Sequence, residues 1–130
     1  MNQNFYDKLN NVIAKDSILI DELMSRHTTF RVGGPADFFV TPKAKEEVRD
    51  VICICKEAGM PYYIIGNGSN LLVSDAGYRG VIVQIYKEMN EVKVEGDLVK
   101  AQAGALLSGI AAKALGAELS GFEFASGIPG

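Results

Sequence analysis

The residues best suited to chemistry in this chain form a glycine-rich turn between two apolar runs. Residues 62–72 read Tyr-Tyr-Ile-Ile-Gly-Asn-Gly-Ser-Asn-Leu-Leu. Gly66 and Gly68 let the backbone turn tightly, so that several backbone N–H groups can converge on an anion. Ser69 and Asn70 add neutral hydrogen-bond donors. The pattern predicts a loop that holds the pyrophosphate of a nucleotide cofactor, and an ordinary glycine-containing turn without a ligand is the alternative.

Two common phosphate-binding loops do not fit these letters. A Walker loop needs a Gly-Lys pair before Ser or Thr, and no Gly-Lys pair occurs in the chain. A Rossmann fingerprint needs a third glycine and then a helix, but Leu71 stands where that glycine should be. Residues 71–80 instead combine apolar chain with a turn rich in Ser, Asp and Gly, before the apolar run 81–83. The loop is therefore predicted to join a strand to a strand.

A strand–helix–strand–strand unit is expected to position this loop. Residues 36–40 read as the first strand, 62–65 as the second and 81–85 as the third. Between the first two strands, Thr41 is expected to cap a helix that ends at Gly59. The expected inward stripe of this helix is Val48, Val51, Ile52, Cys55 and Ala58.

Further elements are expected on both sides of this unit. Residues 4–15 carry apolar residues at helical spacing, and residues 18–20 read as a short strand. After the third strand of the unit, the sequence predicts a hairpin with strands 92–94 and 98–101. A helix over 106–115 follows, before a loop-like end.

Composition narrows the class of protein. The chain has 130 residues, of which 48% are hydrophobic and 22% charged, as expected of a modest globular domain. Its net charge is −3 and its basic residues are scattered, which does not favour a nucleic-acid surface. No apolar run approaches the ~20 residues needed to cross a bilayer. The N-terminus lacks the features of a secretion signal, so a cytoplasmic location is expected.

The residues that most often bind metals are few and poorly placed for it. Cys53 and Cys55 lie two positions apart on the predicted helix and point in different directions. They are therefore expected neither to pair with each other nor to build a zinc site. His27 is the only histidine and is expected to be structural.

Three spaced motifs are similar to those of a known enzyme family. They are Thr28-Thr29-Phe30-Arg31-Val32-Gly33-Gly34-Pro35-Ala36-Asp37, Ile65-Gly66-Asn67-Gly68-Ser69-Asn70-Leu71-Leu72 and Gly127-Ile128-Pro129-Gly130. From about residue 25 to its end, the chain resembles the UDP-N-acetylenolpyruvoylglucosamine reductases, also called UDP-N-acetylmuramate dehydrogenases, of bacterial peptidoglycan synthesis. The first two motifs also resemble those of a wider class of flavin-binding domains.

The resemblance implies an α+β, two-subdomain FAD-binding fold of the flavin oxidase/reductase (PCMH-type) class. It implies an N-terminal helical extension over 1–25 and a first α/β subdomain with the pyrophosphate loop over 26–86. The start of a truncated second subdomain would occupy 87–130, and the substrate domain would be absent. Non-covalent FAD would lie between the two subdomains.

The resemblance also implies which residues contact FAD: Ile65, Gly66, Asn67, Gly68, Ser69, Asn70, Leu71, Gly127, Ile128 and Gly130. Gly104, on a strand-to-helix turn, is a further residue that would approach the cofactor. Arg31 is either a cofactor contact or a surface arginine beside a turn.

The reaction of the family follows from the same resemblance. NADPH reduces FAD, and the reduced flavin reduces the enolpyruvyl group of UDP-N-acetylglucosamine enolpyruvate to give UDP-N-acetylmuramate. The family's catalytic serine, arginine and glutamate lie beyond the motif that ends at Gly130, so no catalytic residue is carried over. This chain alone is expected to be inactive and to self-associate through the truncated face. A different flavin oxidoreductase of this fold and a non-catalytic nucleotide-binding module are the alternatives.

Overall fold

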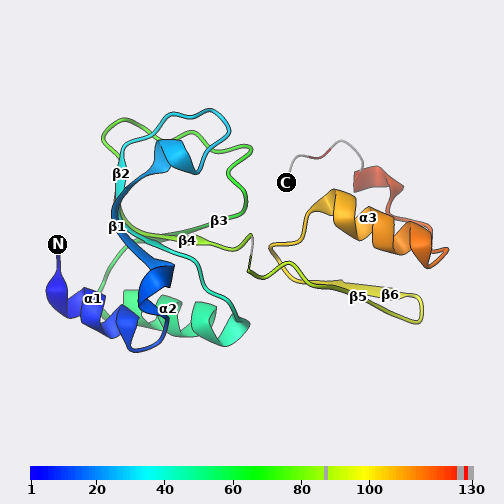
Figure 1. Cartoon of the computed structure of the whole chain (residues 1–130), viewed down its shortest axis with the longest axis horizontal. Coiled ribbons are helices and arrows are strands. Elements are labelled where there is room, and N and C mark those ends of the chain that lie inside the picture. The colour runs from blue at the N-terminus through cyan, green and yellow to red at the C-terminus, as the bar shows by residue number, and fades with distance from the viewer. Residues whose placement is uncertain (87, 126–127, 129–130) are drawn as a thin grey trace.

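A four-stranded mixed sheet forms the centre of the first part of the molecule. The structure is a computed structural model, and it describes residues 1–86, 88–125 and 128 (Figure 1). The strands are β1 (Ile18–Leu23), β2 (Pro35–Val40), β3 (Tyr62–Ile65) and β4 (Tyr78–Gln84), in the spatial order β1-β2-β4-β3. β1 runs antiparallel to β2, whereas β2 and β3 both run parallel to β4. β3 has the predicted bounds, and β4 begins earlier than expected.

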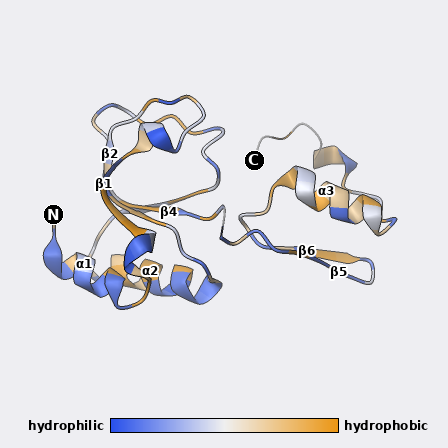
Figure 2. Cartoon of the chain, in the orientation of Figure 1, coloured by the Kyte–Doolittle hydropathy of each residue, from blue (hydrophilic) through white to orange (hydrophobic). Residues whose placement is uncertain are grey.

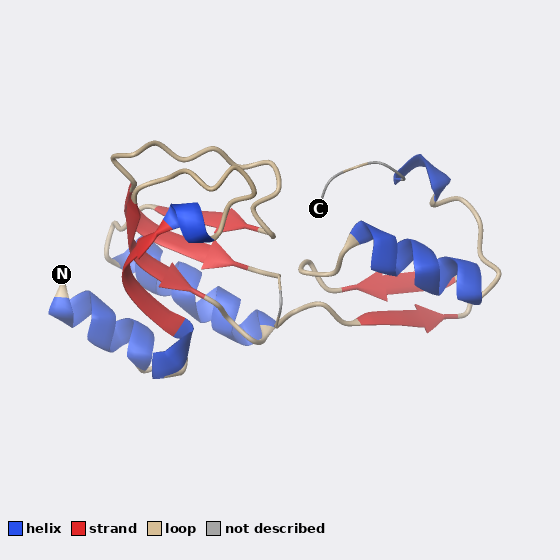
Figure 3. Ribbon diagram, turned by 45° about the horizontal axis from the view of Figure 1, so that its top comes forward, coloured by secondary structure: helices blue, strands red, loops and turns tan. Residues whose placement is uncertain are grey.

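Two helices cover one face of this sheet, as Figure 3 shows. They are α1 (Gln3–Asn10) and α2 (Lys45–Glu57). Figure 2 shows that α2 is hydrophilic along its outer side and hydrophobic toward the sheet. The core between helices and sheet includes Phe5 and Leu9 of α1, Val51 and Cys55 of α2, and Phe38, Val40, Val81 and Val83 of the strands.

The ends of both helices differ from the prediction. α1 ends at Asn10 instead of residue 15, although Ile13 beyond it is still buried. Thr41 does not cap α2, because the helix begins only at Lys45 and Ala44 is its N-cap; the Thr41 N–H donates to the Ser17 carbonyl at 3.0 Å. Ala58 is exposed as the C-terminal cap and lies outside the inward stripe. Gly59 adopts a φ of 63°, which ends the helix as predicted.

A helix-free crossover covers the opposite face of the sheet. Since β3 and β4 are parallel neighbours, the chain must return from the end of β3 to the start of β4. Residues 66–77 make this return as irregular chain, beside the short 3₁₀ helix η2 (Met24–Arg26) (Figure 1). A second apolar cluster lies beneath them: Met24, Ala36, Phe39, Ile65 and Ile82, with Leu71, Val73 and Tyr78 packed against it.

A smaller unit follows the sheet. It contains the hairpin β5 (Val92–Glu95) and β6 (Leu98–Ala101), the helix α3 (Leu107–Gly116) and the 3₁₀ helix η3 (Glu123–Ala125). Gly96 takes a φ of 63° in the hairpin turn, and the strands pair antiparallel as predicted. α3 packs across the hairpin (Figure 3). α3 starts one residue later than expected and runs through Gly116.

The N-terminal segment is part of the first packing unit. β1 pairs with β2 along its length, and Phe5 and Leu9 belong to the same core as the sheet. The boundary drawn from sequence at residue 25 therefore falls between two strands of one sheet. Within the described residues, none of the helices has the length and apolar character to span a bilayer, and no cluster of His, Cys, Asp and Glu is suited to a metal ion.

Candidate cofactor site

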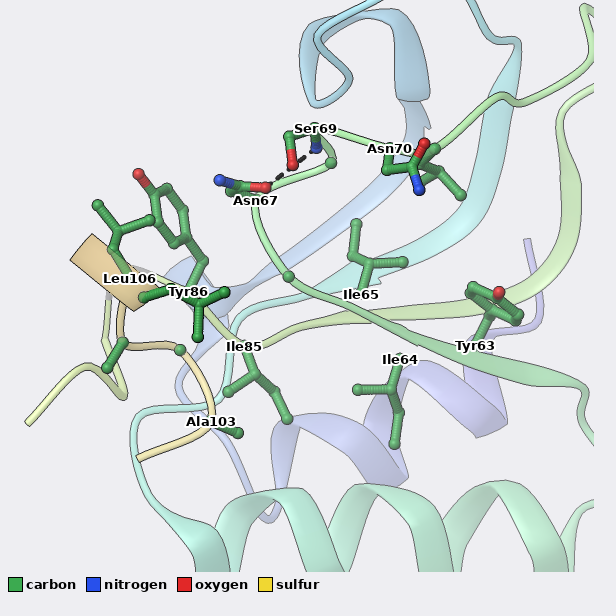
Figure 4. A pocket seen from close by; sticks show the side chains of 16 residues that line it. Tyr63, Ile64, Ile65, Asn67, Ser69, Asn70, Ile85, Tyr86, Ala103 and Leu106 are labelled. Carbon is green, nitrogen blue, oxygen red and sulfur yellow. Dashed lines mark hydrogen bonds between the residues drawn. The ribbon is translucent and has the colours of Figure 1, made fainter. Parts of the chain in front are cut away.

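The glycine-rich loop opens onto a cavity between the sheet and the smaller unit. The loop leaves the carboxyl end of β3, and the cavity has a volume of about 390 Å³. Figure 4 shows Ile65 and Ile64 on one side of this space, with Tyr86 and Leu106 on another. The lining consists of residues 63–71 from the loop and its strand, Ile85 and Tyr86 after β4, and residues 103–107 before and at the start of α3. The cavity therefore brings together the two parts of the chain.

The two glycines of the loop have different physical roles. A Cβ atom at Gly66 would meet no atom within 4 Å, so glycine here leaves open space in front of the loop. Gly68 has a φ of 76°, and a Cβ atom on it would lie 2.0 Å from the carbonyl oxygen of His27. The Gly68 carbonyl also accepts the N–H of Thr29 at 3.1 Å. The packing of the protein itself thus requires glycine at position 68, whereas glycine at position 66 leaves room for a ligand.

The loop keeps several backbone donors unused. Asn67 Oδ1 accepts the Ser69 N–H at 3.0 Å, and Gln84 Nε2 donates to the Gly66 carbonyl at 3.2 Å. Within the described chain, the backbone N–H groups of Gly66, Asn67, Gly68 and Asn70 have no hydrogen-bond partner. Free N–H groups on successive residues of a tight turn suit the oxygens of a phosphate. The loop therefore fits a nucleotide pyrophosphate.

The first sequence motif packs against the crossover that contains this loop. The Gly34 N–H donates to the Ser74 carbonyl at 2.8 Å, and a Cβ atom at Gly34 would lie 2.0 Å from the Asp75 carbonyl oxygen. Gly77 of the crossover is equally close to the motif, because a Cβ atom on it would lie 2.0 Å from the Pro35 carbonyl oxygen. The motif over 28–37 and the crossover over 66–77 are thus two strips of backbone in direct contact.

Gly104 brings the smaller unit into close contact with the segment that follows β4. The Gly104 N–H donates to the Met89 carbonyl at 2.8 Å. A Cβ atom at Gly104 would lie 2.4 Å from the Met89 oxygen and 2.6 Å from the Tyr86 oxygen. This contact places Ala103 and Leu106 at the cavity, where Figure 4 shows them with Tyr86. Gly104 itself lines the cavity, and its lack of a side chain is required by these carbonyl groups.

The structure places the predicted cofactor residues in two groups. Ile65, Gly66, Asn67, Gly68, Ser69, Asn70 and Leu71 all line the cavity. Ile128 instead lines a separate hollow of about 390 Å³ with residues of α3 and of 119–125, and is exposed. Gly127 and Gly130 lie outside the described residues.

Sequence reasoning missed the wall opposite the loop. Tyr86, Ala103, Ala105 and Leu106 line the cavity without belonging to any recognisable motif. Only Gly104 in their midst gave a signal, as a glycine at a strand-to-helix turn. The tertiary contact between residues 86–89 and 104 brings them to the loop, and no local pattern encodes that contact.

Charge is distributed unevenly around the site. Among the described residues that line the cavity there is no carboxyl, guanidinium, ammonium or imidazole group. A second hollow, of about 720 Å³, shares Asn67 and Tyr86 with the cavity and is lined by cationic and hydroxyl groups. Its other residues are Ser25, Arg26, His27, Thr28, Thr29, Arg31 and Gln84. Arg26 and Arg31 therefore lie beside the loop, whereas the described lining of its cavity contains no charged group.

The single histidine has a structural environment. His27 Nε2 lies 2.9 Å from Glu22 Oε1, and its ring stacks on Phe39 with 4.0 Å between ring centroids. Cys53 is exposed and Cys55 is buried, and both are free thiols.

Comparison with known proteins agrees with the geometry of the loop. The model of a family described as FAD binding domain matches residues 36–130. The UDP-N-acetylenolpyruvoylglucosamine reductase of Clostridium botulinum (strain Hall) is 52% identical over 132 aligned residues, covering 100% of this chain and 43% of that protein. The chain thus spans less than half the length of this curated relative.

Solved structures share the arrangement of elements. UDP-N-acetylenolpyruvylglucosamine reductase from Thermus caldophilus matches with a TM-score of 0.65 at 35% identity, covering 83% of this chain and 37% of that one. An alkyldihydroxyacetonephosphate synthase matches with a TM-score of 0.71 at 18% identity, over 90% of this chain and 27% of that one. The second likeness shows a common fold alone.

Proposed function

The chain belongs to the FAD-binding domain family, with FAD as its cofactor, and on this premise we propose that it is the cofactor-binding part of a UDP-N-acetylenolpyruvoylglucosamine reductase. Its fold is the two-subdomain PCMH-type FAD-binding fold expected from sequence. The observation that carries the proposal is the glycine loop with free backbone N–H groups, facing a cavity between the two parts of the chain.

The proposed reaction is the NADPH-dependent reduction of UDP-N-acetylglucosamine enolpyruvate to UDP-N-acetylmuramate in peptidoglycan synthesis. Bound FAD would supply the hydride-transfer chemistry of this reduction. The contribution of this chain is to bind and orient the cofactor. A cytoplasmic location is part of the same proposal, since NADPH and UDP-linked sugars are cytoplasmic metabolites.

The proposed cofactor contacts begin with the loop. The unpaired N–H groups of Gly66, Asn67, Gly68 and Asn70 would donate to the pyrophosphate oxygens, and apolar Ile65 and Leu71 would border the ligand. Gly127, Ile128 and Gly130 remain proposed contacts from the second subdomain. We propose a first subdomain over 26–86 and a second over 87–130, with the N-terminal segment (1–25) packed into the first through β1.

We propose that this chain binds the cofactor without turning over the substrate. Among the described cavity residues, Tyr63, Ser69 and Tyr86 are the only ones with hydroxyl groups, and no carboxyl or imidazole group is present to assist proton transfer. We also propose that the apolar surface around α3 and Phe124 mediates self-association, because Leu115 and Phe124 expose 78% and 77% of their surface.

A flavin titration tests the proposed function. FAD is added to the purified chain, and binding is followed by quenching of flavin fluorescence, with riboflavin as the ligand that lacks the diphosphate. We expect saturable FAD binding that is tighter than riboflavin binding, and no NADPH oxidation with the UDP-sugar present. Equal affinity for FAD and riboflavin would show that the loop does not bind a pyrophosphate.

A further inference from the structure

A hollow with cationic walls lies directly beside the glycine loop. Its volume of about 720 Å³ exceeds that of the neighbouring cavity, and Asn67 and Tyr86 line both spaces. A ligand held at the loop would therefore border this hollow. Arg31 is one of its lining residues and is exposed.

A diphosphate at the loop would carry negative charge that the neutral donors of the loop do not balance. The donors of the loop are neutral, and the described lining of its cavity contains no cation. An anion that is partly removed from water is costly unless a cation compensates it. The adjoining hollow contains two arginines, Arg26 and Arg31, and also His27, which carries a charge only when protonated.

The ion pairs of the structure show which of these groups already has a carboxylate partner. Glu22 lies 3.5 Å from the Arg26 guanidinium and 2.9 Å from His27 Nε2, so one carboxylate already serves both groups. Over the residues that the structure describes, no carboxylate forms an ion pair with Arg31. Arg31 is thus the cation of this hollow whose charge is available to a ligand.

The segment that carries Arg31 is tied to the loop. The Thr29 N–H donates to the Gly68 carbonyl at 3.1 Å, and the Arg31 N–H donates to the Thr28 carbonyl at 3.2 Å. Thr28 is buried, and its hydroxyl donates to the Val32 carbonyl at 3.1 Å. Arg31 itself has a φ of 54°, which residues other than glycine rarely adopt. These bonds hold the turn in one geometry relative to the loop.

We propose that Arg31 supplies the positive charge for a nucleotide diphosphate held at the glycine loop. The inference rests on the proposed function and adds a residue outside the cavity to it. A guanidinium group suits this role because its donors can bind two phosphate oxygens at once. The diphosphate belongs either to FAD or to a UDP-linked or NADP-linked substrate, since all three carry the same group.

The test replaces Arg31 and compares ligands with and without phosphate. Arg31→Gln removes the charge, Arg31→Lys keeps it without the bidentate geometry, and Arg49→Gln is the matched control. Arg49 lies on α2 and pairs with its neighbour Asp50 at 3.0 Å, away from the hollow. Affinities for FAD, ADP, UDP, NADP⁺ and riboflavin are measured for each variant. Circular dichroism melting checks that the variants fold.

We expect Arg31→Gln to weaken FAD and ADP binding at least tenfold, with riboflavin unchanged, Arg31→Lys in between and Arg49→Gln like the parent. That pattern assigns Arg31 to the diphosphate of FAD. Loss of UDP or NADP⁺ binding with FAD unaffected assigns it to a substrate diphosphate instead. Unchanged affinity for every phosphate ligand overturns the inference but leaves the proposed function intact. An equal loss for riboflavin also overturns it, since the effect would then be general. If the parent binds no phosphate ligand, both proposals fail.

Discussion

At the scale of single residues, Gly66 and Gly68 look equivalent in sequence but differ in what they contact. Only Gly68 is forced to be glycine by the protein, through its positive φ and the nearby His27 carbonyl. The sequence predicted a tight, ligand-binding turn at these positions, and the turn is present. It could not distinguish the two roles, because the His27 carbonyl approaches from a distant part of the chain.

Alanine at these two positions is predicted to separate stability from binding. Gly68→Ala should lower the free energy of unfolding by about 2–4 kcal/mol, because the backbone is strained and the His27 carbonyl must move. Gly66→Ala should change stability by less than about 1 kcal/mol but weaken FAD binding, since the methyl group enters the open space before the loop. Urea unfolding and FAD titration measure the two effects. The assignment fails if Gly66→Ala is the more destabilising change.

Cys55 gives the molecule a predicted sensitivity to high pH. Burial raises the pKa of the Cys55 thiol from 9.0 to about 11. The folded-state pKa lies above the unfolded one. The contribution of the protonated Cys55 thiol to the free energy of unfolding is therefore fully present below pH 9 and is lost as the pH rises through 11. The expected loss is about 2–3 kcal/mol, at about 1.4 kcal/mol per pKa unit.

Urea unfolding at pH 8 to 11 checks this prediction. Cys55→Ala should be less stable than the parent at pH 8, because a buried side chain is shortened, but should show a shallower decline with pH. Cys53 is the internal control, since it is exposed and its replacement should leave the pH dependence as it was. Parallel pH profiles for the parent and Cys55→Ala are the contradicting result.

At the scale of elements, local patterns predicted the strands better than the helix ends. β3 and the hairpin strands alternate or concentrate apolar residues between clear turn signals, so their positions follow from sequence. The predicted start of α2 was wrong: Ala44 is the N-cap, without a side-chain capping bond, and Thr41 lies before the helix, hydrogen-bonded through its N–H to Ser17. The crossover was predicted as strand-to-strand, but the parallel pairing of β3 with β4 depends on tertiary structure.

The packing between the first motif and the crossover is predicted to control the loop from a distance. Gly34 does not line the cavity, yet a methyl group there would push against the Asp75 carbonyl of the crossover. Gly34→Ala should therefore destabilise the protein by about 2 kcal/mol or more and also weaken FAD binding. Gly109→Ala on α3 is the matched control, because a Cβ atom there meets nothing within 4 Å.

Unfolding curves and FAD titrations on both variants test this effect. If Gly34→Ala binds FAD as the parent does, the first motif does not position the loop. A loss of binding in the control as large as in Gly34→Ala would point to a general effect of alanine.

At the scale of the whole molecule, the two units meet at the cavity and differ in how well they are covered. The sheet of the first unit is packed on both faces, by α1 and α2 on one and by the crossover on the other. α3 packs on the hairpin, whereas Leu115 of α3 and Phe124 of η3 stay largely exposed. Exposed large apolar side chains promote association in water.

Self-association through the α3 surface is the corresponding prediction. Leu115 and Phe124 are 78% and 77% exposed. Variants with charged residues at these positions should therefore fold normally and associate less. Leu115→Lys with Phe124→Lys is expected to shift the sedimentation profile toward monomer at concentrations where the parent forms larger species. Leu72→Lys is the matched control, because Leu72 is 75% exposed but lies on the first unit. The sedimentation profile of Leu72→Lys should match that of the parent, since the surface that drives association is around α3 and Phe124. An equal shift in Leu72→Lys would place the contact elsewhere. So would an unchanged profile of the double variant.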